Sequence, residues 1–189
     1  MNLLKLRSYN LERAKVYGDK PTEGQKLIAL RSRPHVHTEL QFSERHNNIS
    51  FSAEKGLGAR FKDIKYSHEY RWDTIFVWMT DEQEDACYAK AKEIEGTPYD
   101  FFGLLGYATS LDIIKPHPKK VWCTEAVVIV LMAGRKDFVE YLIMLKQPVE
   151  LKPDELDSLA RYYFSKVEKL YDGADAQNAV NELILADRQ

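Results

Sequence analysis

The sequence predicts an α+β fold in which a small antiparallel sheet packs against one buried helix and a helical extension follows. Short segments rich in β-branched and aromatic residues recur between residues 35 and 78, separated by polar or glycine-containing turns, as is typical of strands. The stretch at residues 121–134 is almost entirely apolar over its last ten residues and ends at Gly134, a residue that terminates helices well. Apolar residues recur at helical spacing beyond residue 153.

The composition fits a single soluble domain in a reducing compartment. The chain has 189 residues, enough to bury a real core. Its 27 Lys and Arg nearly balance 29 Asp and Glu, the net charge is −2, and no long basic stripe is visible. Nucleic acid is therefore not expected as the main partner, because neutralising phosphates requires clustered cations. Cys87 and Cys123 form no C-x-x-C pair, and two thiols favour a reducing compartment.

We expect a cytoplasmic protein without a membrane span. The first residues carry charge early and lack the apolar core of a signal peptide. The longest uninterrupted apolar run, residues 126–133, is far shorter than the roughly 20 residues that cross a bilayer. An origin in a phage, with association to the virion, is compatible with these features.

The strands are expected in the first half of the chain. Residues 1–20 are mixed, and the leucines there fit either a strand or a short helix. A turn at residues 21–24 precedes a short amphipathic segment at residues 25–31. Alternating or β-rich segments then predict strands at residues 35–42, 49–53, 56–64 and 72–78, the first two joined as a hairpin.

Helices are expected in the second half. Thr80 and Gln83 have the spacing of a capping box, which predicts a helix to about residue 95. Cys87 lies in it among alanines, where we interpret it as core packing. Residues 99–107, dense in aromatic residues and glycine, predict a packed loop or short helix. The apolar helix follows, and further helices are expected at residues 137–145, from residue 152 onward, and at residues 175–186.

The strand at residues 35–42 has an unusual polar face. Alternation places His35, His37, Glu39 and Gln41 on one side and apolar or β-branched residues on the other. The polar side is either the solvated face of an edge strand or part of a functional site. The histidine spacing also fits a metal site, but no further His/Cys cluster completes a ligand set, so we predict no metal.

Cys123 stands where the apolar helix should begin, because Pro116 and Pro118 keep the preceding segment out of helix. Unpaired N–H groups and the positive end of the helix dipole stabilise a thiolate there and lower the cysteine pKa. A cysteine so placed, with a histidine brought to it by the fold, is a nucleophile arrangement. The alternative interpretation is a small buried residue that opens a core helix.

The order of these elements resembles the circularly permuted branch of the papain-like fold. This branch includes NlpC-type amidases and peptidases, YiiX-type bacterial and phage proteins, and lecithin:retinol acyltransferase. In it the histidine strand precedes the cysteine helix, as His37 precedes Cys123 here. The matching stretches, within about residues 20–134, are residues 37–40, 50–52, 58–61, 72–73, 99–106 and 122–125.

The resemblance implies roles for the site residues. Cys123 is the expected nucleophile, and His37 is the expected base, selected over His35 because the family's histidine is followed by x-Glu-Leu. A third polar group should orient the imidazole, with Glu39 as first choice and Ser52 as second. The Cys123 backbone N–H and one other donor would hold the oxyanion. The expected substrate-binding residues are Ser52, His35 and Tyr99.

We therefore expect a cysteine hydrolase that cleaves an amide bond, as an amidase or peptidase of peptidoglycan or another peptide-like substrate, and that needs no cofactor. A thioesterase or lipid acyltransferase would use the same acyl-enzyme. The remaining alternative is a non-catalytic binding or structural protein on the same scaffold. Residues 1–134 would form the catalytic domain, and residues 135–189 a helical extension packed on it, whose role the sequence leaves open.

Overall fold

The computed structural model describes residues 1–66, 68–104, 116–145 and 151–167. Its centre is a five-stranded antiparallel sheet in the order β4-β3-β2-β1-β5, so the α+β class predicted from the sequence is confirmed. The strands are β1 (Asn2–Asn10), β2 (His35–Gln41), β3 (Ser50–Glu54), β4 (Gly58–Lys62) and β5 (Trp72–Met79). Two short helices, α1 (Leu11–Val16) and α2 (Glu23–Ile28), lie between β1 and β2 in the chain.

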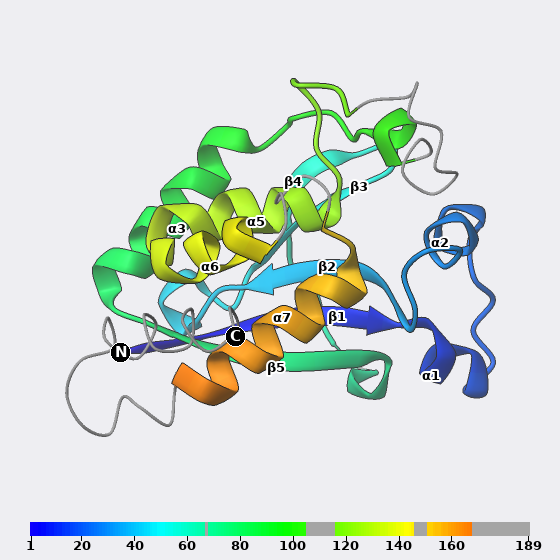
Figure 1. The fold of residues 1–189 in the computed structure, drawn as a ribbon, viewed down its shortest axis with the longest axis horizontal. Coiled ribbons are helices and arrows are strands. Elements are labelled where there is room, and N and C mark those ends of the chain that lie inside the picture. The colour runs from blue at the N-terminus through cyan, green and yellow to red at the C-terminus, as the bar shows by residue number, and fades with distance from the viewer. Residues whose placement is uncertain (67, 105–115, 146–150, 168–189) are drawn as a thin grey trace.

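Four helices cover one face of the sheet, as Figure 1 shows. They are α3 (Asp81–Ile94), α5 (Cys123–Gly134), α6 (Lys136–Leu145) and α7 (Pro153–Val167). Helix α5 packs on β2 and β3 between α3 and α6, while α7 crosses β2, β1 and β5. None of the helices in the described part of the chain has both the length and the apolar character needed to cross a membrane.

Alternation along the strands separates an apolar core face from a polar face. Leu6 of β1 and Leu40 of β2 are fully buried beneath the helices. Helix α5 is apolar almost all round because the sheet, α3 and α6 enclose it. Phe138 of α6 and Tyr163 of α7 belong to the same core. The described helices of the C-terminal extension therefore share one hydrophobic core with the sheet.

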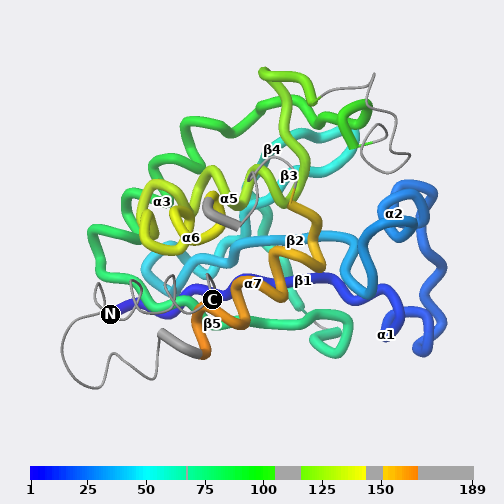
Figure 2. Tube along the Cα trace, in the orientation of Figure 1, coloured from blue at the N-terminus to red at the C-terminus, as the bar shows by residue number. Residues whose placement is uncertain are grey.

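The expected elements lie close to their predicted positions. Residues 2–10 form a strand, which decides between the two options left open for the N-terminus, and this strand runs between β2 and β5 (Figure 2). Thr80 and Gln83 form both bonds of the predicted capping box. The helix expected at residues 175–186 and the end of the aromatic-glycine segment, residues 105–107, lie outside the described residues.

Strands β2 and β3 diverge near the middle of β2. They pair through Leu40 with Phe51 and Gln41 with Ser50. Further along, the Ser52 hydroxyl donates to the Thr38 carbonyl at 2.6 Å in place of a strand hydrogen bond. This divergence leaves the backbone N–H of the buried Thr38 without a ladder partner in β3, and it positions the site described below.

Candidate active site

Cys123 is the first residue of α5, where the sequence predicts it. Trp122 before it is extended, with φ −99° and ψ 179°, and its side chain does not cap the helix. The first N–H groups of a helix have no partner within the helix, so their partial positive charge acts at the end where the thiol lies. Cys123 is only 3% exposed, which strengthens that interaction because little water screens it.

Two groups of β2 stabilise the Cys123 thiolate. The interactions of its sulfur with His37 and with the backbone N–H of Thr38 both lower the pKa of the thiol, and the Thr124 hydroxyl lies 3.9 Å from the sulfur. In an antiparallel strand the N–H and C=O of one residue face the same neighbour, so the divergence from β3 frees this N–H for the sulfur. Burial raises the pKa of the thiol, but the contacts with His37 and Thr38 outweigh it and hold the pKa below its ordinary value.

His37 connects the thiol to a buried carboxylate. Its Nε2 lies 3.1 Å from Oε1 of Glu39, which leaves Nδ1 as the nitrogen available to the Cys123 sulfur. Burial lowers the pKa of this imidazole, but the hydrogen bonds with Cys123 and Glu39 prevail and raise the pKa to about 10. These opposite pKa shifts favour a thiolate–imidazolium pair at neutral pH.

Glu39 is held in its charged form by residues from outside its strand. The carboxylate is 1% exposed and accepts from the Tyr66 hydroxyl at 2.8 Å and from Lys62 Nζ at 3.4 Å. Burial raises the pKa of Glu39, but His37, Lys62 and Tyr66 together lower it below its ordinary value. A cation–π contact holds Tyr66 in place, because the guanidinium of Arg7 lies 3.9 Å above its ring centre.

His37, Glu39 and Glu54 also come close enough to be considered as metal ligands, since one ligand atom of each lies within 4.8 Å of the others. The ammonium group of Lys62 already lies between the two carboxylates. Its Nζ lies 2.8 Å from Glu54 Oε1 and 3.4 Å from Glu39 Oε1, and it supplies the positive charge that a cation would bring. The arrangement therefore fits a lysine-bridged carboxylate pair better than a metal centre.

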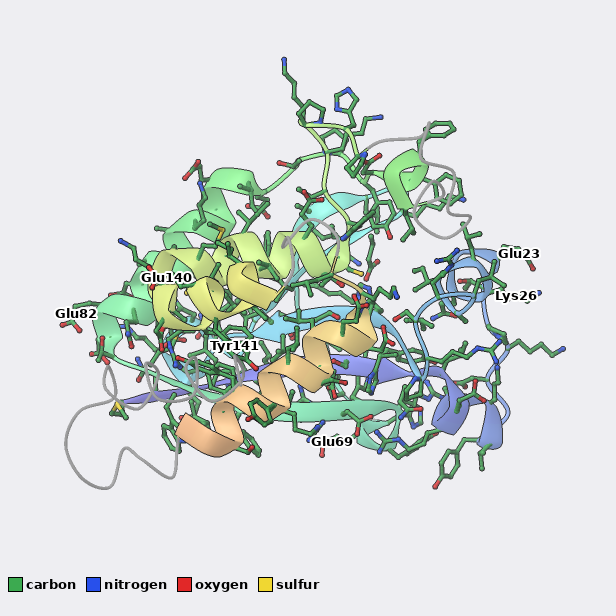
Figure 3. The ribbon with its side chains drawn as sticks, in the orientation of Figure 1. Glu23, Lys26, Glu69, Glu82, Glu140 and Tyr141 are labelled. Atoms are coloured by element: carbon green, nitrogen blue, oxygen red, sulfur yellow. The ribbon has the colours of Figure 1, made fainter. Side chains whose placement is uncertain are left out.

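A cleft of about 580 Å³ opens beside His37 and Glu39, a size that suits a small molecule or part of a peptide. Glu23 and Gln25 of α2 line one side, and Figure 3 shows Glu23 at the outer edge of the molecule next to Lys26. Cys123 is not part of this wall. The aromatic and charged lining residues are Tyr9, Trp72, Tyr99, Glu54, Lys55 and Lys62.

The other residues predicted for the site lie in different settings. Tyr99 lines the cleft, and burial, together with the nearby Cys123 charge, raises its phenol pKa well above 10, so it stays neutral. Ser52 is buried and bonded to the Thr38 backbone, which leaves Glu39 as the partner of His37. His35 is buried with Nε2 2.7 Å from Asp73 Oδ2 and does not line the cleft.

Sequence reasoning missed Lys62, Tyr66 and Glu54, which surround the Glu39 carboxylate. Glu54 accepts from Arg60 at 2.6 Å as well as from Lys62; burial raises its pKa, but these contacts lower it to about 2. No local pattern marks these residues, because Tyr66 follows β4 in a segment without helix or strand periodicity. Their proximity to Glu39 depends on how β3 pairs with β2 and how β4 pairs with β3.

Comparison of the chain with protein-family models, with curated proteins and with solved structures gives no match.

Proposed function

We propose that the chain is a cysteine hydrolase on a permuted papain-like fold, which cleaves an amide bond through an acyl-enzyme on Cys123. The observation that carries the proposal is the linked set of a thiol at a helix start, a histidine that lowers the pKa of this thiol, and a buried carboxylate hydrogen-bonded to the histidine. The histidine strand β2 precedes the cysteine helix α5 in the chain, which is the order of the permuted branch.

The first half of the reaction forms the acyl-enzyme. The Cys123 thiolate attacks the substrate carbonyl carbon, so an S–C bond forms and negative charge moves to the oxygen. The backbone N–H of Cys123, unpaired within its helix, is one donor for that oxyanion. As the C–N bond breaks, the His37 imidazolium gives its proton to the leaving amine nitrogen.

The second half releases the acid. His37, now neutral, accepts a proton from water while the water oxygen attacks the acyl carbon. The S–C bond breaks and the thiolate–imidazolium pair returns. Glu39 does not touch the reacting atoms; it positions His37 and stabilises its positive charge. A peptide-like substrate, with peptidoglycan as one candidate, suits the cleft volume.

One observation favours the non-catalytic alternative, a binding protein on the same scaffold. Cys123 is only 3% exposed and does not line the large cleft, so a substrate carbonyl must displace part of the wall to reach its sulfur. A merely structural thiol would be buried in the same way. Reactivity of the thiol distinguishes the two.

The test is the pH dependence of Cys123 alkylation by iodoacetamide, followed by peptide mass spectrometry. We expect Cys123 to react well below pH 8.5, the ordinary range of a thiol, and to lose this reactivity in His37→Ala. His35→Ala is the matched control, because it removes the other histidine of β2 and leaves Cys123 and His37 unchanged. Cys87 should stay unreactive, since burial raises its pKa to about 12. Ordinary reactivity of Cys123, indifferent to His37→Ala, would refute the proposal.

A further inference from the structure

A second, much smaller cavity borders Cys123 and Thr124 at the start of α5. Its volume is about 10 Å³, close to the room of one water molecule. Apart from Ser32 and Lys152 its remaining lining is apolar, in contrast to the charged cleft beside His37. The apolar lining residues are Ile28, Leu104, Trp122, Leu151 and Pro153.

The chemistry of acyl transfer gives the two spaces different roles. His37 must hand its proton to the leaving group, so the leaving group has to lie on the His37 side of the sulfur. The large cleft lies on that side. The acyl group stays bonded to Cys123 after the leaving group departs, so it needs room next to the cysteine. The small apolar cavity borders Cys123 and so offers room of this kind.

We propose that this cavity is the acyl-group subsite, and that the substrate carries a short apolar acyl group, of acetyl size, joined to a larger polar leaving group. The inference rests on the proposed function, because it assigns the substrate class of the same acyl-enzyme. A methyl group is close in size to one water molecule and so suits a space of this volume, whereas each further methylene would have to push the walls apart at a cost in packing.

The C-terminal extension supplies one wall of the subsite. Leu151 and Pro153 lie at the start of α7, and Leu151 is 1% exposed. This end of α7 is fixed to the segment before β2, because the backbone N–H of Asp154 donates to Ser32 Oγ at 3.2 Å and Ser32 Oγ donates to Asp154 Oδ1 at 2.7 Å. Residues outside the part that resembles the permuted papain-like branch therefore set the size of the acyl group.

The test uses p-nitrophenyl esters of acetate, propionate, butyrate and hexanoate. Each forms an S–C bond to Cys123 and releases p-nitrophenolate, so the burst of p-nitrophenolate and the added mass on Cys123 report acylation. Rates are divided by those of free cysteine with the same ester, which removes intrinsic reactivity. We expect acetyl transfer to be the fastest and to exceed hexanoyl transfer at least about tenfold, which corresponds to about 1.4 kcal/mol.

Two variants that enlarge the cavity, Leu151→Ala and Leu104→Ala, test whether it holds the acyl group. Each should raise the hexanoyl-to-acetyl ratio about tenfold, because it opens room beside Cys123. Leu142→Ala is the matched control: it removes an equally buried leucine from the core but not from the cavity wall, so it should leave the ratio unchanged. Circular dichroism and thermal melting establish that each variant is folded.

The outcomes separate the two proposals. Acylation that needs Cys123 and His37 but shows no preference for short chains, or a preference that neither enlarging variant changes, overturns the acyl subsite and leaves the hydrolase proposal standing. A ratio that changes equally in Leu142→Ala also overturns it, because core loosening would then explain the effect. Failure of every ester to acylate Cys123 overturns both.

Discussion

Nε2 of His37 lies 3.1 Å from Oε1 of Glu39, two residues further along the same strand. Residues i and i+2 of a strand project from the same face, so the strand itself brings these side chains together. The carboxylate then keeps its charge through longer-range contacts with Tyr66 and Lys62. The contact between His37 and Glu39 is therefore local in sequence, whereas the residues that keep Glu39 charged come from distant parts of the chain.

Glu39→Gln removes the negative charge while keeping the size of the side chain. His37 then loses one of the two groups that raise its pKa against burial, so its folded pKa should fall below about 10. Because a raised histidine pKa keeps the proton until the pH passes that value, the alkaline limb of the activity profile should move to lower pH. We expect the acylation rate at neutral pH to fall by about 10²-fold, the scale of a misplaced general base.

The pH–rate profile of Cys123 acylation checks this prediction. Asp85→Asn is the matched control, because Asp85 Oδ1 lies 3.1 Å from His46 Nε2 in another histidine–carboxylate pair, outside the site. An unchanged alkaline limb in Glu39→Gln, with the same rate as Asp85→Asn, would exclude Glu39 as the positioning group of His37.

Tyr66→Phe removes the hydroxyl that donates to Glu39 Oε2 at 2.8 Å. A hydrogen bond to a charged group contributes about 1.5–3 kcal/mol, so the variant should lose about that much free energy of unfolding at pH 7. The pKa of Glu39 is held below its ordinary value, so this stabilisation exists above that value and disappears as the pH falls through the folded pKa. The difference from wild type should therefore shrink in acid.

Urea unfolding at pH 7 and at successively lower pH measures the difference. Tyr70→Phe serves as control, since the Tyr70 ring contacts Tyr17 at the surface, away from Glu39. A destabilisation by Tyr66→Phe that is independent of pH would mean that the hydroxyl acts through packing and not through the charge of Glu39.

Much of the fold could be predicted because its elements carry local signals. The capping box at Thr80 and the apolar run behind Cys123 mark helix starts directly. The N-terminal strand was ambiguous because it contains three buried polar residues, Arg7, Ser8 and Asn10, and the first two break the apolar alternation. Arg7 is accepted there because it donates to Gln41 Oε1 at 2.9 Å, a cross-strand contact that only the sheet order reveals.

The candidate site also has a part that local sequence patterns predicted and a part that they did not. The strand spacing predicted that Glu39 shares a face with His37, and the helix start predicted the position of Cys123. The frame around Glu39 comes from β4 and the segment after it, so sequence spacing alone did not indicate it. The wall formed by Leu151 was likewise hidden, because it depends on how α7 returns to the sheet.

Gly134→Ala should destabilise the fold through the contact between α3 and α5. A Cβ at this position would overlap the Gln83 carbonyl oxygen and lie 2.6 Å from Cys87 Sγ, so the two helices would have to separate. Overpacking of this kind costs about 1–3 kcal/mol. Gly24→Ala in α2 is the matched control: the nearest atom to its Cβ would be 4.0 Å away, and alanine favours helix. Denaturant unfolding should show a loss for Gly134→Ala and no loss for Gly24→Ala, and equal effects would contradict the close approach.

Lys62→Met should allow the site to bind zinc. The methionine keeps an apolar stem but removes the ammonium that lies 2.8 Å from Glu54 and 3.4 Å from Glu39. With that positive charge gone, a divalent cation is no longer repelled from the carboxylates, and we expect zinc affinity to rise at least about tenfold. Zinc needs the neutral imidazole of His37, whose pKa is raised to about 10, so binding should release a proton and strengthen with pH.

Isothermal titration with zinc in buffers of different ionisation enthalpy measures both the affinity and the proton release of Lys62→Met. Lys55→Met is the matched control, because Lys55 also lines the cleft but lies over the Phe101 ring. Wild type and Lys55→Met should bind zinc equally weakly. If Lys62→Met binds zinc no better than they do, the ammonium is not what keeps cations from His37, Glu39 and Glu54. The spacing of those three ligands would then have to be unsuited to a metal even without the lysine.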